Sequence, residues 1–313
     1  MKYIKSEVTK QANEEGYITD TFEKVLRLTD ILKFINQDSF LKDKLVLKGG
    51  TAINLLLSSL PRLSVDIDLD YTHDEVEPNR DKIASIIKKY MIAANYELSS
   101  RSRFSKALDS FVYSYTNSSG NKDNIKIEIN YVLRKHIFEA SIKEVTINSD
   151  TFEVRMLHKI ELYGSKITAL LNRGAARDLF DIDNMIKNNL ITKSEEDYLR
   201  KAIIFYSLLT TNEDELFEYD KLEAISEKKI KSDLYPVLRK RGLFDLIIAK
   251  QNASDFLTRI LVPNDNEQKF IKKFYQGELD LALLFDDKKA IQRIKNHPMI
   301  TWKLKHIKEH LKK

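Results

Sequence analysis

Residues 45–71 read LVLKGGTAINLLLSSLPRLSVDIDLDY, and this stretch decides the fold of the chain. The apolar run at residues 45–47 predicts a short buried strand. A glycine pair ends that strand, Thr51 can cap the helix that follows, and Pro61 stops it. From residue 63 to residue 71, apolar and polar residues alternate, which predicts a second strand with one buried face.

The second strand carries three carboxylates on one face. Side chains alternate across a strand, so the apolar residues share one face and the polar residues share the other. The apolar face comprises Leu63, Val65, Ile67 and Leu69, and the polar face comprises Ser64, Asp66, Asp68 and Asp70. Same-face neighbours lie about 6.6 Å apart at Cα, and carboxylates this close repel one another unless a cation lies between them. A hard divalent ion, most readily Mg²⁺, fits this pattern, whereas a solvated acidic edge is the inert alternative.

Two other segments give the carboxylates a functional context. Lys48, Gly49, Gly50 and Thr51 lie between a strand and a helix, where backbone amides and the positive end of the helix dipole converge and suit a triphosphate. A plain turn is the alternative. Residues 125–130, IKIEIN, alternate again and place Glu128 on a polar face.

A third carboxylate on a neighbouring strand is what a two-metal phosphoryl-transfer centre needs. Asp66, Asp68 and Glu128 could then hold two ions about 3.5–4 Å apart, with Asp66 or Asp68 between them. Glu128 could also accept the proton of an attacking hydroxyl. A glutamate on a strand at the edge of a sheet is otherwise simply solvated.

Composition and pattern together set the expected architecture. The 313 residues are 42% hydrophobic and 32% charged, which excludes a wholly disordered chain, and eight glycines and five prolines indicate long elements. Strand signals, including a hairpin over 109–116 and 124–133, end near residue 157. We therefore expect an α+β fold, with a small mixed sheet flanked by helices in a domain over residues 1–155. An all-helical domain should follow over residues 156–313.

Cysteine usage and hydropathy indicate the compartment. The chain has no cysteine, which permits a reducing cytoplasm, the expected location. No apolar run approaches the roughly 18 residues of a membrane helix, so no membrane partner is expected.

The helical half contains a second group of charged residues. Lys166 and Arg173 are seven residues apart and share one helix face, where two cations suit a triphosphate. Asp178 and Asp181 could instead orient either cation. The alternative is a surface helix on which Arg177 and Asp181 form an ordinary i,i+4 pair.

The C-terminal segment is strongly basic, although the net charge of the chain is only +5. Residues 288–313 contain nine lysines or arginines, a single acid, and three histidines, His297, His306 and His310. The segment is either a solvated helix face or a phosphate-binding surface.

The glycine pair, the D-x-D strand and the later acid together resemble the DNA polymerase β superfamily of nucleotidyltransferases. The sixteen residues from Gly50 to Asp66 are slightly more than in the commonest form of that signature. The run KGGTAI followed by RLSVDID resembles one family within it, the AbiEii-type toxins of type IV toxin–antitoxin systems, which include the MenT-type toxins. A later block, KITALLNR followed by RDLFD, is similar to a further motif of that family, so the resemblance extends over residues 45–182.

The resemblance implies a polymerase β-like core, a reaction and a context. The family uses Mg²⁺ to transfer a nucleoside monophosphate from a nucleoside triphosphate (NTP). In characterised members the acceptor is the tRNA 3′ end, so translation and growth stop, and a cognate antitoxin protein counters the toxin. Ser64, Asp66, Lys166 and Asp178 fall on positions important for that activity, and Asp68 and Glu128 fall on the metal positions of the superfamily.

The expected site has three overlapping sets of residues. The catalytic set is Asp66, Asp68, Glu128, Lys166 and Asp178; the nucleotide-binding set is Lys48, Gly49, Gly50, Thr51, Ser64, Lys166 and Arg173; the metal set, expected to hold two Mg²⁺ ions, is Asp66, Asp68 and Glu128. Two alternatives remain, one an enzyme with the same core and another acceptor, and one a module with a decayed site. The chain could nucleotidylate a small molecule such as an aminoglycoside, or a protein, or it could be a non-catalytic module that binds an antitoxin or nucleic acid.

Overall fold

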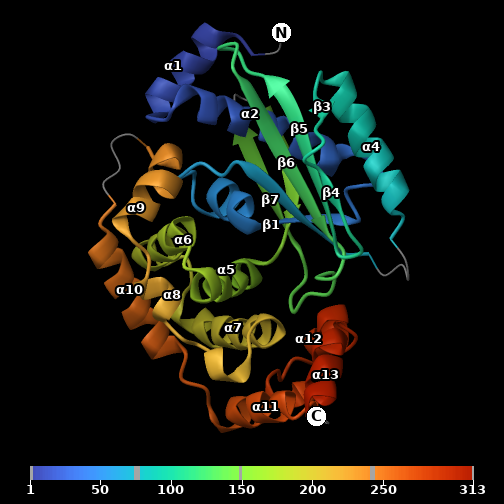
Figure 1. Cartoon of the computed structure of the whole chain (residues 1–313), viewed down its shortest axis with the longest axis vertical. Coiled ribbons are helices and arrows are strands. Elements are labelled where there is room, and N and C mark those ends of the chain that lie inside the picture. The colour runs from blue at the N-terminus through green and yellow to red at the C-terminus, as the bar shows by residue number, and fades with distance from the viewer. Residues whose placement is uncertain (1–2, 74–77, 148–149, 240–243, 312–313) are drawn as a thin grey trace. The chain divides into compact units, whose positions relative to one another are not determined.

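The computed structural model describes residues 3–73, 78–147, 150–239 and 244–311. The chain forms two compact units. Unit 1 comprises Met1–Arg134, Ala140–Leu157 and Tyr235–Gly242, and unit 2 comprises Lys135–Glu139, His158–Leu234 and Leu243–Lys313. Figure 1 shows the elements of each unit.

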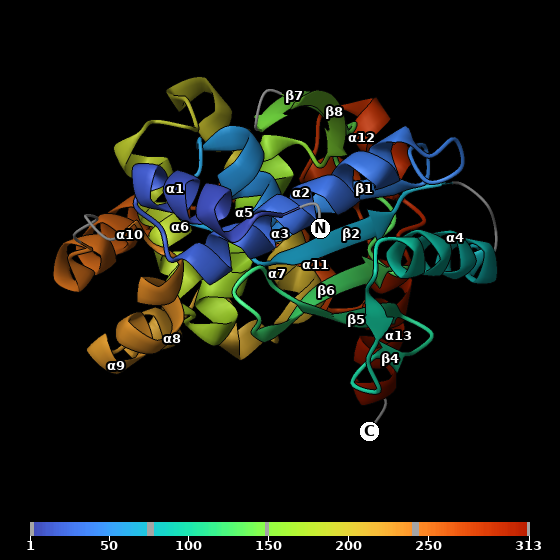
Figure 2. The ribbon, with the colours of Figure 1, turned by 90° about the horizontal axis from the view of Figure 1, so that it is seen from above.

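Unit 1 is built on a mixed sheet that has eight strands within the described residues. The strands are β1 (Leu45–Lys48), β2 (Asp66–Tyr71), β3 (Glu97–Leu98), β4 (Arg103–Phe104), β5 (Leu108–Thr116), β6 (Lys122–Asn130), β7 (Ser141–Ile147) and β8 (Asp150–Met156). Their order is β3-β5-β6-β2-β1-β8-β7, with β4 paired to β5. Figure 2 shows the run from β7 through β8, β1, β2 and β6 to β5. The pairs β2–β6 and β1–β8 are parallel and the other pairs are antiparallel.

Helices flank this sheet. They are α1 (Lys5–Glu15), α2 (Thr19–Gln37), α3 (Gly49–Thr51), the π-helix η1 (Ala52–Leu57) and α4 (Arg80–Ala93), with a short 3-10 turn, η5 (Tyr235–Val237). The long helix α2 contacts β2 and β8 and buries Leu28, Ile31 and Leu32. On β2, Ile67 and Leu69 are buried as the alternation predicts. Fully burying a side chain of this size contributes about 1.5–3 kcal/mol, so β2 is firmly anchored in the core.

Unit 2 is helical, and after Met156 the described residues contain no strand. Its helices are α5 (Lys159–Arg173), α6 (Ala176–Lys187), α7 (Glu196–Thr210), α8 (Asp220–Glu223), α9 (Glu227–Lys229), α10 (Leu246–Ile260), α11 (Asp265–Tyr275), α12 (Lys288–Ile294) and α13 (Pro298–His310), with the shorter turns η2 (Lys193–Glu195), η3 (Glu213–Glu215), η4 (Ile230–Leu234) and η6 (Leu281–Leu283). Helices α5 and α7 pack closely because Gly164 has no side chain. A Cβ atom there would lie 2.9 Å from the Cβ of Ala202.

The predicted fold class is confirmed, with three local differences. The helix after β1 begins at Gly49, so Thr51 lies inside it and does not cap it. Strand β2 begins at Asp66, because the preceding residues follow another segment: the amide of Leu63 donates to the carbonyl of Val237 at 2.8 Å. The β7–β8 hairpin was not predicted. No helix in the described part of the chain is long and apolar enough to cross a membrane.

Candidate functional site

The register of three strands brings the predicted carboxylates together in unit 1. Strand β2 pairs in parallel with β6, and this pairing sets Asp68 opposite Glu128 and Asp66 opposite Lys126. Strand β1 pairs with the other edge of β2 and sets Lys48 opposite Asp68. Side chains directly opposite each other on paired strands point to the same face of the sheet. The Asp66–Asp68 face and Glu128 therefore belong to one surface.

The glycine pair brings main chain against this surface. Gly49 has a φ of +71°, and a Cβ atom at this position would lie 2.4 Å from Oδ2 of Asp68. Glycine is therefore required here both for its backbone conformation and for space. The start of α3 consequently lies directly beside the carboxylate of Asp68.

The second glycine and Thr51 lie against the residues that lead into β2. A Cβ atom on Gly50 would lie 2.9 Å from Nη2 of Arg62 and 3.0 Å from Oγ of Ser64. The Thr51 hydroxyl is hydrogen-bonded to Oγ of Ser64 at 3.0 Å and to the carbonyl oxygen of Asp66. These contacts join the glycine turn and the aspartate strand into one structure, and they use the Thr51 hydroxyl that was expected to cap the helix.

A lysine already acts as a counter-ion for the carboxylates. Nζ of Lys126 lies 3.1 Å from Oε2 of Glu128. Burial lowers the pKa of Lys126, but the negative charges of Asp66, Glu128 and Asp68 outweigh this effect and raise it. Burial raises the pKa of Asp68, and the charges of Asp66 and Glu128 raise it further against the opposing effect of Lys48 and Lys126. The cluster thus has the electrostatics of a cation-binding site.

Lys48 pairs with the third carboxylate of the strand. Its ammonium forms an ion pair with Asp70, which is 1% exposed. Burial raises the pKa of Asp70 to about 6, although Lys48 opposes the rise. Asp70 therefore serves to hold Lys48 at the end of β1.

The donor set suits a hard cation. Asp66, Asp68 and Glu128 offer only carboxylate oxygens, which Mg²⁺ prefers, and the Lys126 ammonium shows that positive charge is favoured among them. Within the described residues, no group of three or more histidine, aspartate or glutamate side chains converges into a preformed metal site. The residues fit Mg²⁺ by their chemistry, and their role as its ligands stays a prediction.

The charged residues predicted in the helical half form one network in unit 2. Nζ of Lys166 lies 2.9 Å from Oδ1 of Asp178 and 3.1 Å from Oδ2 of Asp181. Arg173 donates from Nε to Oδ2 of Asp178 at 2.7 Å and from Nη2 to Oδ1 at 3.1 Å. Burial raises the pKa of Asp178, but Lys166 and Arg173 outweigh burial and lower it. Asp178 therefore fixes the positions of both cations.

The turn between α5 and α6 makes this network possible. Gly174 ends α5 with a φ of +56°, and a Cβ atom there would lie 2.0 Å from the carbonyl oxygen of Lys221. This tight turn returns Asp178 to Lys166 and Arg173. Arg177 donates to the carbonyl of Asp233 at 2.9 Å and Asp181 pairs with Lys166, so the surface-helix alternative does not describe this region.

The basic C-terminal segment divides into a buried and an exposed part. His297 is fully buried at the start of α13, where Nδ1 accepts from the amide of Met299 at 3.1 Å. Burial lowers its pKa to about 4, so His297 is a neutral structural residue. Along α13, Lys305, His306 and His310 are exposed.

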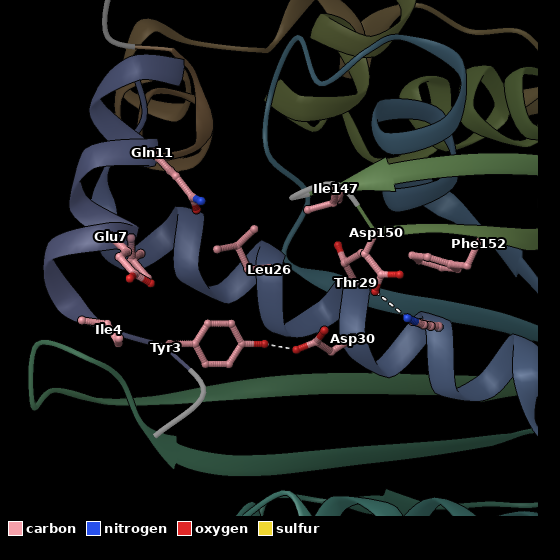
Figure 3. A pocket seen from close by; sticks show the side chains of 12 residues that line it. Tyr3, Ile4, Glu7, Gln11, Leu26, Thr29, Asp30, Ile147, Asp150 and Phe152 are labelled. Atoms are coloured by element: carbon pink, nitrogen blue, oxygen red, sulfur yellow. Dashed lines mark hydrogen bonds and ion pairs between the residues drawn. The ribbon is translucent and has the colours of Figure 1, made fainter.

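A separate pocket of about 260 Å³ lies in unit 1 between α1, α2 and the β7–β8 hairpin (Figure 3). Tyr3 donates to Asp30 at its wall, and Lys33 pairs with Asp150. None of the predicted site residues lines this pocket, so the candidate site is the strand surface described above.

Two residues of the site were missed by the sequence reasoning. Arg62 is 2% exposed, lies against Gly50 and donates from Nη1 to the carbonyl of Leu63 at 2.9 Å. Lys126 lies beside Glu128. The signal for Lys126 was available, since it is two residues before Glu128 and so shares its face of the strand.

Comparison with known proteins agrees with this geometry. Residues 30–288 match the protein family described as nucleotidyl transferase AbiEii toxin of a type IV toxin–antitoxin system. Among solved structures, MenT4, a nucleotidyltransferase toxin from Mycobacterium tuberculosis H37Rv, is similar in fold: the TM-score is 0.67, the identity is 15%, and 96% of this chain and 99% of that chain are covered.

An antigenic nucleotidyltransferase-like protein from Paracoccidioides brasiliensis matches with a TM-score of 0.36 and 20% identity, over 51% of this chain and 76% of its own. No curated protein matches the chain by sequence.

Proposed function

The chain belongs to the AbiEii family of nucleotidyltransferase toxins of type IV toxin–antitoxin systems, and from this premise we propose that it uses Mg²⁺ to transfer a nucleoside monophosphate from an NTP to the 3′ end of a tRNA. The transfer blocks translation and growth, and a cognate antitoxin protein counters it. The observation that carries the proposal is the pairing of Asp68 with Glu128 across β2 and β6, with the backbone of Gly49 against Asp68.

We assign the reacting groups of unit 1 as follows. Asp66, Asp68 and Glu128 would hold Mg²⁺, which would neutralise triphosphate charge and increase the acidity of the attacking hydroxyl. The backbone amides of Gly49, Gly50 and Thr51 and the hydroxyl of Ser64 bind phosphate oxygens, while Lys48 contributes positive charge.

The chemical step is an in-line displacement. The 3′-oxygen of the acceptor forms a bond to the α-phosphorus, the bond from that phosphorus to the bridging oxygen breaks, and pyrophosphate leaves with the electron pair. Glu128 accepts the hydroxyl proton. Nζ of Lys126 lies 3.1 Å from Oε2 of this carboxylate.

In unit 2, we assign Lys166 and Arg173 to the phosphates of the nucleotide, where they offset developing charge. Asp178 acts through these cations and not on the substrate, because its oxygens accept from both. It is therefore a positioning residue. Its loss should raise KM for the NTP as well as lower kcat.

We infer the acceptor from the charge of α13, and the compartment from where the two substrates occur. The exposed lysines and histidines of α13 favour an RNA backbone over a small uncharged acceptor. A tRNA and an NTP meet in the cytoplasm, so we place the toxin there.

The test is incubation of the protein with total tRNA, Mg²⁺ and each of the four α-labelled NTPs. We expect label on tRNA with one of the four, and we expect Asp66→Asn to lower the transfer rate more than about a hundredfold, since even groups that only support metal ligands contribute 10–100-fold. Asp150→Asn is the matched control, because Asp150 lies in the same sheet and pairs with Lys33 on another surface.

The outcomes separate the alternatives. Label on an aminoglycoside or on a protein but not on RNA would replace the proposed acceptor. Full activity in a folded Asp66→Asn variant would refute the proposed site, and equal losses in Asp66→Asn and Asp150→Asn would show that the effect is not specific to the carboxylate cluster.

A further inference from the structure

A pocket in the C-terminal part of unit 2 has aromatic walls and a mixed charged rim. It lies between η3, α11 and α13, and its volume is about 650 Å³, within the 300–1,000 Å³ that is usual for small-ligand sites. Tyr275 of α11 and Trp302 of α13 line it, together with Lys303, His306 and the acidic residues of η3.

The tryptophan at this pocket is the single tryptophan of the chain, and 51% of its surface is exposed. The imidazole of His306 lies beside it, with ring centroids 4.0 Å apart and an interplanar angle of 35°. Nδ1 of His306 lies 2.8 Å from the carbonyl oxygen of Trp302, which holds the two rings together one helical turn apart. The pair presents a fixed aromatic surface to the pocket.

The walls around this surface are held by hydrogen bonds. Nζ of Lys303 donates to the carbonyl of Thr211 at 3.0 Å, and the hydroxyl of Tyr275 donates to the same oxygen at 3.2 Å. Helix α13 also packs closely on the end of α11, because a Cβ atom on Gly277 would lie 2.8 Å from the side chain of Lys308. The pocket is therefore preorganised, and its side chains would lose little conformational entropy when a ligand binds.

The charges around the pocket differ from one side to the other. Helix α13 carries Lys303, Lys305 and Lys308 but a single acid, Glu309. The Glu309 carboxylate lies 3.9 Å from Lys305, in an exposed and therefore weak pair. On the opposite wall, Glu213 and Asp214 are exposed carboxylates. A phosphate is attracted to the lysines and repelled by the carboxylates, whereas carboxylates accept hydrogen bonds from the amino groups of bases.

We propose that this pocket binds a nucleobase of single-stranded RNA, stacked on Trp302, with its edge toward Glu213 and Asp214 and its flanking phosphates on the lysines of α13. Aromatic stacking beside basic side chains is the usual means of binding single-stranded nucleic acid. The choice of RNA as the polymer rests on the proposed function. A cytosine, which carries an exocyclic amino group, fits the carboxylates better than a uracil.

The single tryptophan provides a direct test that does not depend on catalysis. Oligocytidylate and oligouridylate hexamers are titrated into the full chain without NTP while Trp302 fluorescence is followed. We expect quenching that saturates, with tighter binding of the cytidylate. Stacking contributes about 1–3 kcal/mol per base, and 1.4 kcal/mol is tenfold in affinity, so Trp302→Leu should weaken binding of dye-labelled oligocytidylate about tenfold or more in an anisotropy assay.

Two variants keep the test interpretable. Trp302→Phe preserves an aromatic face and should bind within about threefold of the native chain, given that every aromatic ring offers a stacking surface. Tyr198→Leu removes another aromatic of unit 2 that is equally exposed, at 50%, and should leave binding unchanged. Far-UV circular dichroism confirms that each variant is folded.

The results distinguish this inference from the proposed function. Saturating anisotropy without tryptophan quenching, unchanged binding by Trp302→Leu, or quenching by a protein partner but not by RNA would each overturn the nucleobase site. Equal affinity for the two oligomers would overturn the assignment of Glu213 and Asp214 to the base edge. If RNA binds at Trp302 but no NTP labels tRNA, the nucleobase site stands and the proposed acceptor falls.

Discussion

Replacing Asp178 by asparagine should destabilise the protein by about 2–3 kcal/mol, because a buried carboxylate that accepts three charge-assisted hydrogen bonds loses its charge. Breaking a buried ion pair typically costs about 3–5 kcal/mol. The lower figure applies here because Asp181 still lies 3.1 Å from Lys166. In the Asp178→Asn variant, the Lys166 ammonium thus keeps one of its two carboxylate partners.

The variant Lys166→Met should cost more, about 3–5 kcal/mol. It leaves Asp178 and Asp181, each 1% exposed, with Arg173, whose side chain is 64% exposed. Asp178 then keeps a cation that is largely hydrated, and Asp181 loses the ammonium that lies 3.1 Å from it. The double variant with Lys166→Met and Asp178→Asn loses one positive and one negative charge, which offset each other. Its loss in free energy of unfolding should therefore be about 1–3 kcal/mol smaller than the sum of the two single losses.

Urea denaturation of the native chain and the three variants measures this coupling. The control cycle uses Lys305 and Glu309, an exposed pair 3.9 Å apart, which should couple by less than about 0.5 kcal/mol. Nucleotide transfer should fall in all three variants and should be lost in the two that lack Lys166, including the double variant whose stability is partly restored. Strictly additive costs at Lys166 and Asp178 would refute the charge network, and recovery of activity in the double variant would refute the role of Lys166.

Three further substitutions test other parts of the structure. Gly49→Ala should abolish transfer, because its Cβ would lie 2.4 Å from Asp68. Gly120 also has a positive φ, but a Cβ there would meet no atom within 4 Å. Gly120→Ala should therefore cost about 1 kcal/mol of stability and leave activity unchanged. Lys126→Met should lower the melting temperature measured in chelator, because the carboxylates lose their counter-ion. For the same reason, Mg²⁺ should raise the melting temperature of this variant more than that of the native chain. An equal rise in both would contradict this prediction. The pKa of His297 is lowered to about 4 from 6.5, so its contribution is complete above pH 6.5 and is lost as pH falls toward 4, at most about 3 kcal/mol. His297→Asn keeps an acceptor at the start of the helix and should flatten the pH dependence of the free energy of unfolding in that window, and an unchanged slope would exclude His297 as its source.

Much of the site surface could be predicted because a strand has a period of two. Within β2, the alternation gave Ile67 and Leu69 correctly as buried residues, although Asp70 on the polar face is buried as well. The same period of two places Lys126 on the face of Glu128, so its position at the site was also predictable. The pairing of Asp68 with Glu128 is different in kind, because register depends on which strands meet, and no local pattern specifies a parallel partner sixty residues away.

Where prediction failed, contacts distant in sequence decide the structure. The β7–β8 hairpin has mostly exposed residues on its first strand, so it lacks the alternation of a half-buried strand. Thr51 looked like a helix cap because its preference is local, but its hydroxyl is used by Ser64 and Asp66 of the next strand.

The two charged clusters share one feature, which is the pairing of lysine side chains with carboxylates. Lys126 pairs with Glu128, Lys48 pairs with Asp70, and Lys166 pairs with Asp178 and Asp181. Such pairing keeps buried charges from being left uncompensated, which would cost several kcal/mol each. A divalent ion entering the strand surface must therefore compete with an ammonium group that the chain itself supplies. Under the proposed function, a triphosphate that arrives with its metal would bring negative charge for Lys48 and Lys126. We therefore expect the metal and the nucleotide to favour each other's binding.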